Sequence, residues 1–230
     1  QISPDYPGWI RETIRSVYGV DTVVPFLPGA IGDLSPTDYR SPDSETRTHY
    51  DDPQGPRKAR QVGRTIGGSC LRVLAERETQ VAPRLRVATV SEPLATRKPS
   101  EPRLDEVRSV IETPEAPLRD RVLAETLVEY AAFQRRTPSL RAETQQFVVG
   151  NAGFVTYPGE PFAEFALELR RETDGPTFVV SCANDWLGYL PTEVAFENGG
   201  YETTPGRVCP LEPSAGRRLT DVAIEVMRDF

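Results

Sequence analysis

A glutamate at the apex of a tight turn is the first residue that could carry chemistry. Residues 156–162 read "TYPGEPF" and place Glu160 between Gly159 and Pro161, after an apolar run and before an amphipathic one. Proline suits the first position of a helix, where its missing N–H breaks no hydrogen bond, so Glu160 would be the N-cap or its neighbour. The positive helix end stabilises a carboxylate there by about 0.3–1 kcal/mol. Ser, Thr, Asp and Asn are better N-caps than Glu, so a ligand role stays open beside the capping role.

A second polar stretch, "NDWLGYLPT", follows the apolar run "TFVVSCA" at the end of an expected strand. Loops at strand ends often carry functional residues. The amide of Asn184 can orient a neighbouring group. The phenol of Tyr189 can donate a proton, stabilise an oxyanion or, once deprotonated, bind a metal. The structural alternative is a capped strand end with Trp186 and Tyr189 packed against it.

A third stretch, "GAIGDLSP", is a glycine-rich turn that presents Asp33 and Ser35 directly after the apolar run "VVPFLP". It lacks the GxSxG pattern of an α/β-hydrolase nucleophile elbow. It also lacks the GxGxxG and P-loop patterns that bind phosphates. A turn in which Asp33 or Ser35 caps the backbone is therefore the alternative to a catalytic role.

Composition limits the partners and the metal sites that this chain could form alone. The net charge of −7 and the pI near 5.0 argue against nucleic acid or an anionic membrane as partner, because both need a basic surface. Three cysteines (Cys70, Cys182 and Cys209) without CxxC spacing exclude a zinc ribbon or a redox dithiol, and we expect buried free thiols. One histidine, His49, lies in the charged, proline-rich stretch 36–56, where we expect it on the surface. A site that needs two or three histidines is therefore incomplete in this chain.

Hydrophobic periodicity and turn residues predict the elements that position these stretches. We expect helices over residues 7–18, 57–78, 103–112, 117–136, 161–172, 191–197 and 213–228, and strands over 84–94, 143–149, 153–157 and 177–184. Within 21–33 we expect a short apolar strand that runs into a glycine-rich turn. The "GNAG" turn predicts a hairpin, and the Gly67-Gly68 pair predicts close helix packing. The fold class is therefore mixed α/β (α+β), with helices packed on a mixed sheet rather than a purely parallel one.

Taken in order, the three stretches resemble the neutral/alkaline (non-lysosomal) ceramidase family of zinc-dependent amidases. That family has a GxxGDxSP segment, a PGE turn before a helix, and an N…Y loop leading to YE. Here these are "GAIGDLSP", "PGE" and "NDWLGY" leading to "GGYET", and the opening "ISPDYPGW" is similar as well. The resemblance spans nearly the whole chain and is best at 20–36 and 155–203. It implies that residues 1–230 are the C-terminal portion of a single ceramidase-like catalytic domain, without the immunoglobulin-like domain of true ceramidases. The start without Met favours a fragment or a processed chain.

The resemblance also implies a role for each matched residue. Glu160 and Tyr189 match the family's zinc-ligand glutamate and tyrosine. Tyr201, in "GGYET", matches a tyrosine that stabilises the oxyanion of the tetrahedral intermediate. Ser35 matches the serine beside the metal that has been proposed as nucleophile. The family's two histidine ligands lie upstream of the segment matched here, so an N-terminal segment or a second chain would supply them.

The implied function is zinc-dependent hydrolysis of an N-acyl amide bond, a ceramidase-like reaction of lipid metabolism. Zn²⁺ would polarise the amide carbonyl and activate water, while Tyr201 would hydrogen-bond the oxyanion. Asp33 or Asn184 could orient a ligand through hydrogen bonds. Two alternatives stay open: a metallohydrolase of the same fold that acts on a small soluble amide or ester, and a non-catalytic binding protein that has lost its metal. The sequence does not show whether the protein is secreted or cytoplasmic.

Overall fold

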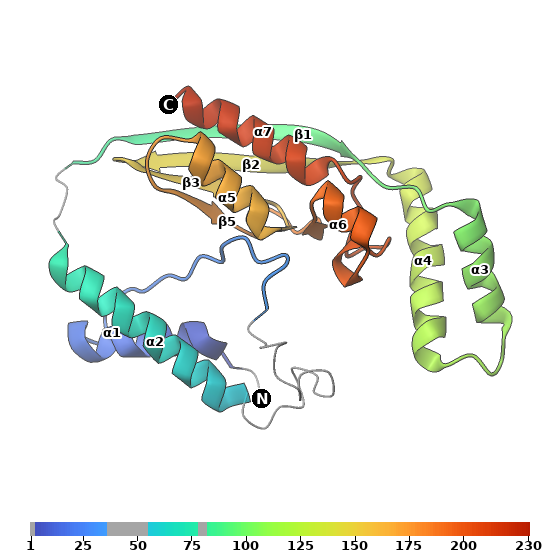
Figure 1. Cartoon of the computed structure of the whole chain (residues 1–230), viewed down its shortest axis with the longest axis horizontal. Coiled ribbons are helices and arrows are strands. Elements are labelled where there is room, and N and C mark those ends of the chain that lie inside the picture. The colour runs from blue at the N-terminus through green and yellow to red at the C-terminus, as the bar shows by residue number, and fades with distance from the viewer. Residues whose placement is uncertain (1–2, 36–54, 78–81) are drawn as a thin grey trace. The chain divides into compact units, whose positions relative to one another are not determined.

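The computed structural model describes residues 3–35, 55–77 and 82–230 (Figure 1). They fall into two compact units. The helical unit comprises Gln1–Leu27 and Ser35–Ala82, and the sheet unit comprises Pro28–Leu34 and Pro83–Phe230. The prediction for His49 falls outside the described residues. None of the described helices is long and apolar enough to cross a bilayer.

The helical unit is built on the packing of α1 (Asp5–Tyr18) against α2 (Gly55–Glu76), which confirms the two predicted N-terminal helices. The helices approach so closely at Gly67 that an added Cβ would lie 2.7 Å from the Cβ of Thr13. Gly68 instead faces open space. The predicted close packing is therefore confirmed for Gly67 and wrong for Gly68.

Residues 21–33 form no strand, so that prediction is wrong. Pro25 and Pro28 lack the N–H groups that a strand would donate to its neighbour, which explains why this apolar run does not join a sheet.

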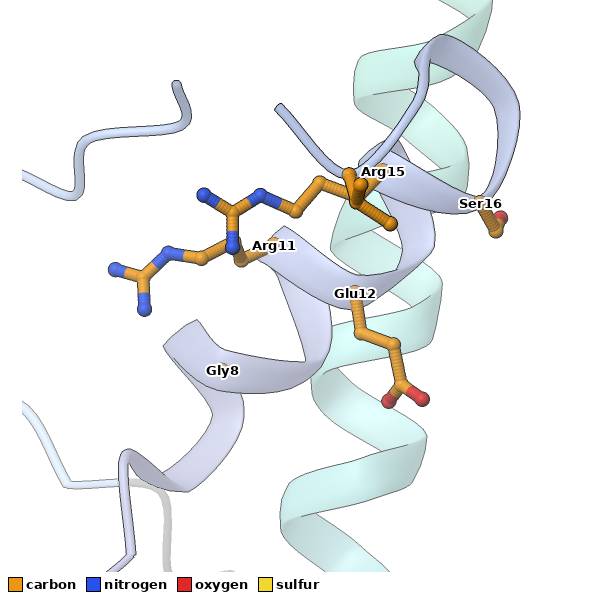
Figure 2. A pocket seen from close by; sticks show the side chains of 6 residues that line it. Gly8, Arg11, Glu12, Arg15 and Ser16 are labelled. Carbon is orange, nitrogen blue, oxygen red and sulfur yellow. The ribbon is translucent and has the colours of Figure 1, made fainter. Parts of the chain in front are cut away.

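Two arginines of α1 instead hold the start of this run. Arg15 donates its Nε–H to the carbonyl of Thr22 over 2.8 Å, and Arg11 does the same to Val24 over 3.3 Å. Figure 2 shows both side chains leaving α1 on the same side, where they help to line a shallow depression.

The sheet unit contains a four-stranded sheet in the order β1-β2-β3-β5. The strands are β1 (Leu85–Ala95), β2 (Ser139–Val149), β3 (Ala152–Thr156) and β5 (Thr177–Val180). β1, β2 and β3 are antiparallel, whereas β3 and β5 are parallel. The mixed sheet confirms the predicted fold class, and the turn at Gly150-Asn151 confirms the hairpin.

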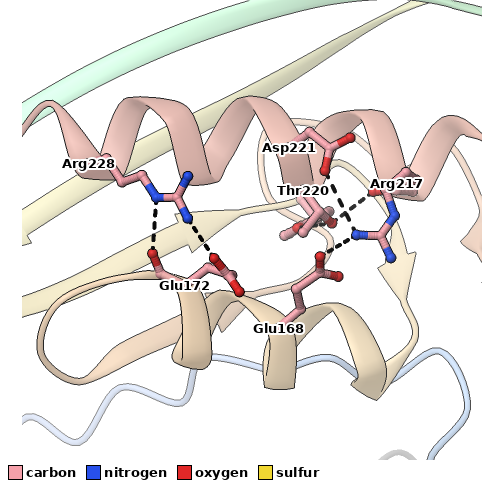
Figure 3. Close-up of polar contacts among 8 residues, drawn as sticks. Glu168, Glu172, Arg217, Thr220, Asp221 and Arg228 are labelled. Atoms are coloured by element: carbon pink, nitrogen blue, oxygen red, sulfur yellow. Dashed lines mark hydrogen bonds and ion pairs between the residues drawn. The ribbon is translucent and has the colours of Figure 1, made fainter.

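Two helices, α5 (Ala163–Glu172) and α7 (Ala215–Arg228), cover one face of this sheet (Figure 1). Leu169 of α5 and Leu219 of α7 are fully buried, and they pack with Val155 of β3. Two ion pairs cross between the helices on their outer side, Arg217 to Glu168 and Arg228 to Glu172 (Figure 3). The sheet unit thus has one covered face with a continuous apolar core.

A helical hairpin of α3 (Glu101–Glu112) and α4 (Leu118–Arg136) lies between β1 and β2 in the chain and has its own core. Its most buried side chain, Tyr130, places its hydroxyl 2.8 Å from the carbonyls of Arg97 and Pro210. The remaining helix is the short α6 (Glu193–Asn198), which makes seven α-helices in the described residues. With the exception of the strand at 21–33, each predicted element is present, although several boundaries differ.

The two neighbouring glycines of α2 give a matched test of the helix packing. Gly67→Ala is expected to lower the free energy of unfolding of the helical unit by about 1–3 kcal/mol, because the methyl group overlaps Thr13. Gly68→Ala is expected to raise it by up to about 1 kcal/mol through helix propensity. Chemical denaturation followed by circular dichroism measures both. Equal effects of the two substitutions would contradict the close approach.

Candidate functional site

The candidate residues lie on loops that leave the ends of the two parallel strands. β3 ends at Thr156 beside the end of β5 at Val180, and the loops that follow carry Glu160 and Tyr189. Backbone hydrogen bonds join these loops: Cys182 N–H donates to the Gly159 carbonyl over 2.9 Å, and Leu187 N–H donates to the Pro158 carbonyl over 2.7 Å. The carboxyl ends of parallel strands are the usual place for ligand sites in α/β proteins.

Glu160 and Tyr189 are brought together by a second, two-stranded sheet. β4 (Glu160–Pro161) pairs in parallel with β6 (Tyr189–Leu190), and Glu160 lies opposite Tyr189 in the register. The predicted N-cap role of Glu160 is wrong, because α5 begins at Ala163 and its N-cap is Phe162. Pro161 occupies a strand position that needs no N–H donor from it, so the proline does not mark a helix start.

Glycines allow the strand pair to form, because the backbones around it lie too close for side chains. A Cβ added to Gly159 would lie 2.4 Å from the carbonyl oxygen of Gly188. A Cβ on Gly32 would lie 2.3 Å from the carbonyl oxygen of Glu160 itself. Gly188 also has a φ of +86°, which side chains rarely adopt. Gly32, Gly159 and Gly188 therefore share one structural task, which is to let the backbones around the strand pair approach closely.

Trp186 is the hydrogen-bond partner of Glu160 that sequence reasoning missed. Its indole Nε1–H donates to Oε1 of Glu160 over 2.9 Å. The indole N–H can only donate, so it holds one oxygen of the carboxylate in place. The sequence placed Trp186 in the correct loop but showed no reason to choose Glu160 as its partner.

Tyr189 keeps its proton firmly in this environment. The pKa of Tyr189 is raised to about 12, first by burial and then by the negative charge of Glu160. A hydrogen bond with the Glu160 carboxylate contributes in the same direction, since it stabilises the neutral phenol. Tyr189 is therefore a neutral phenol at physiological pH, and only a strong local positive charge would make it a tyrosinate.

Tyr201 lies beside this pair. It begins the short 3₁₀ helix η1 (Tyr201–Thr203), and its ring meets that of Tyr189 edge to face with centroids 5.9 Å apart. Its side chain is 66% exposed. Arg97 holds the same turn by donating from Nη2 to the carbonyl of Thr203 over 2.7 Å. The structure therefore brings Glu160, Tyr189 and Tyr201 together.

Asp33 and Asn184 support the segments around the strand pair. Oδ1 of Asp33 accepts a hydrogen bond from the first N–H of α5, at Ala163, over 2.7 Å. Asn184 has a left-handed φ of +72° and donates from Nδ2 to Oγ1 of Thr156 over 3.3 Å. Ser35 is exposed and groups with the helical unit, so its proximity to Glu160 stays a prediction.

The three cysteines are free, as expected, but only Cys209 is fully buried. Burial raises its pKa to about 11. Cys182 is exposed, contrary to the prediction, and follows the end of β5 in a left-handed conformation. Partial burial of its thiol and then the charge of Glu160 raise the pKa of Cys182.

The donors present fit a zinc ion in kind but not in number. Glu160 and Tyr189 offer two oxygen donors, whereas a hydrolytic zinc site has three protein ligands and an open position. Among the described residues, no group of three or more His, Cys, Asp or Glu side chains could hold a metal ion. A complete site needs donors from elsewhere.

Two solved structures with a similar fold are ceramidases. The neutral ceramidase of Pseudomonas aeruginosa superposes with a TM-score of 0.65 at 15% sequence identity. The fold is ceramidase-like. A ceramidase complexed with C2 gives a TM-score of 0.64 at 14% identity. The similarity covers 97% and 99% of this chain but 40% and 43% of those chains, so these residues span less than half of each ceramidase. No protein-family model matches the sequence, and no curated protein matches it.

The charge of Glu160 can be tested through the titration of Tyr189. Glu160→Gln is expected to lower the pKa of Tyr189 from about 12 toward its ordinary value near 10, with burial keeping it above that value. A pH titration of metal-free protein, followed by the absorbance of tyrosinate, measures this pKa. Comparison with Tyr189→Phe identifies the part of the absorbance change that belongs to Tyr189. The raised pKa stabilises the folded chain below pH 10, and this contribution is lost as the pH rises to about 12. An unchanged Tyr189 titration in Glu160→Gln would refute the coupling.

Proposed function

We propose that this chain supplies part of the metal site of a zinc-dependent hydrolase that cleaves an N-acyl amide bond. The observation that carries the proposal is the register of β4 with β6, which sets Glu160 opposite Tyr189. Tyr201 stands 5.9 Å from the Tyr189 ring, measured between centroids. A carboxylate and two phenols in one small region form an arrangement suited to binding a cation and stabilising an oxyanion. The ceramidase-like fold supports this reading.

Each residue has a defined task in this proposal. When bound, zinc would supply the Lewis acidity that polarises a carbonyl and activates water. Glu160, with one oxygen fixed by Trp186, would offer its other oxygen to the metal. Tyr189 would bind after losing its proton, and Tyr201 would donate a hydrogen bond to the oxyanion. Ser35 is the proposed nucleophile, and Asp33 and Asn184 maintain the backbone on either side of the ligand pair.

The missing ligands would come from an N-terminal segment or from a second chain. The sequence contains one histidine, so two histidine ligands cannot both come from one copy of it. The ceramidases with this fold are more than twice as long as the part that matches. The proposed hydrolase is therefore an assembly of these residues with further polypeptide.

The metal assignment is tested on the complete assembly, as purified from its source. Glu160→Ala is expected to lose stoichiometric zinc and amidase activity together, because the carboxylate is a ligand. Glu164→Ala is the matched control, since Glu164 is an exposed carboxylate on the first turn of α5. Elemental analysis measures zinc, and hydrolysis of ceramide beside short N-acyl amides measures activity. Retention of zinc by Glu160→Ala would show that the ligand assignment is wrong.

Tyr201 gives a separate test of the chemistry. Tyr201→Phe is expected to keep zinc and lower kcat by about 10²–10³, the usual cost of removing one oxyanion donor. Trp186→Phe serves as the comparison, since it removes a donor to Glu160 and not to the substrate. Unchanged kcat in Tyr201→Phe would exclude the oxyanion role.

The two alternative functions have their own outcomes. Preference for short N-acyl amides or esters over ceramide would assign the hydrolase to small soluble substrates. A zinc-free wild-type assembly would indicate a binding protein.

A further inference from the structure

The face of the four-stranded sheet opposite α5 and α7 carries an apolar row that crosses every strand. Val87 of β1 pairs with Phe147 of β2, Phe147 pairs with Phe154 of β3, and Phe154 pairs with Phe178 of β5. The rings of Phe154 and Phe178 stack with centroids 5.5 Å apart at an interplanar angle of 28°. Directly paired residues point to the same face of a sheet, so the four side chains form one continuous strip.

This strip lies on the uncovered face. The alternate residues point the other way: Val155 and Val179 lie in the core with α5 and α7, and an added Cβ on Gly153 would meet Met227 of α7. Val87 is 51% exposed and Phe178 is 43% exposed, and Leu85 and Val149 beside them are exposed as well. Within the sheet unit, none of the described helices packs against this face.

An open sheet face of this composition is unusual for a stable surface. Antiparallel sheets with one solvated face place polar residues there, and large exposed apolar patches mark interaction sites. The covered face of β2 instead buries Thr144 and Gln146, while Phe147 lies on the open face. The strands thus place three aromatic side chains on a face that none of the described helices of the sheet unit covers.

We propose that this apolar sheet face is the docking surface for the polypeptide that completes the ceramidase-like fold and brings the missing metal ligands. The proposal rests on the proposed function for the identity of the occupant. Its other support is the extent of the fold: the chain matches the Pseudomonas aeruginosa ceramidase over 97% of its own length but 40% of that chain. More than half of such a fold has no counterpart in these residues and needs a surface on which to pack.

The position of the row favours the same occupant. Phe154 and Phe178 lie on β3 and β5, the two parallel strands whose carboxyl ends lead to Glu160 and Tyr189. A polypeptide seated on the row therefore lies beside strands that run directly to the incomplete ligand set. A second copy of this chain would also cover apolar side chains, but it would add only another His49. It would therefore bury the row without supplying two histidines per site.

The test compares the complete assembly, purified from its source, with the 230-residue chain expressed alone. Hydroxyl-radical footprinting reports how accessible each side chain is. Oxidation of Phe147, Phe154 and Phe178 is expected to fall several-fold in the assembly. Leu167 is the control, because it is exposed on α5, which lies on the opposite side of the sheet from the apolar row. It should be oxidised equally in both samples. Equal oxidation of the three phenylalanines in both samples would overturn the proposal.

Two further outcomes would also overturn it. Protection of the row in the isolated chain at monomer mass would mean that no added polypeptide is needed. An assembly whose native mass equals two copies of this chain would identify the second copy as the occupant. In the expected case the native mass includes further polypeptide, and Phe154→Glu with Phe178→Glu weakens its association, whereas Leu167→Glu does not.

Zinc content separates this proposal from the one on which it rests. A protected row in an assembly without zinc would leave the docking surface intact and refute the metal site. Stoichiometric zinc in an assembly whose row stays accessible would support the metal site and refute the docking surface. Because footprinting uses the unmodified protein, a folding defect in a variant does not affect either conclusion.

Discussion

The pairing of β4 with β6 is the contact on which the candidate site depends. It consists of two residues on each strand, and Glu160 and Tyr189 are each only partly buried. The pairing persists because the flanking loops share backbone hydrogen bonds, such as Glu160 N–H to the Gly188 carbonyl over 2.9 Å. Close backbone contact requires glycine at 159 and 188, so the positions of the candidate side chains Glu160 and Tyr189 depend on residues that have no side chain.

Larger elements of the sheet unit hold the segments of this strand pair in place. α5 follows β4 directly and is buried through Phe165 and Leu169, which holds the carboxyl side of the glutamate segment in place. Gly32 N–H donates to the Pro161 carbonyl over 3.0 Å, and Asp33 caps the start of α5. The "GAIGD" stretch thus supports the glutamate segment through backbone contacts and a helix cap, which gives its resemblance to the GxxGDxSP segment a structural explanation separate from catalysis.

Sequence reasoning found the long elements and the right loops, and it failed where an element was too short or ambiguous for periodicity. Helices such as α4 and α7 repeat their apolar residues over several turns, and "GNAG" has one favoured turn geometry. Pro161 fits both a helix start and a strand edge, because its fixed φ suits both, and a two-residue strand has no alternation to detect. The alternation in β2 also does not say which face is covered, so burial of Gln146 rather than Phe147 could be known only from the packing of α7. The hydrogen bond from Trp186 to Glu160 joins two segments that are separate in the sequence, so no local pattern encodes it.

The high pKa of Tyr189 has a consequence for how such a site would fill. With a pKa of about 12, the phenol holds its proton throughout the physiological range, and a cation that binds the phenolate must displace that proton. Filling the site is then an exchange of one proton for one metal ion, in addition to any protons that other ligands release. The affinity of such a site for a cation would therefore rise with pH.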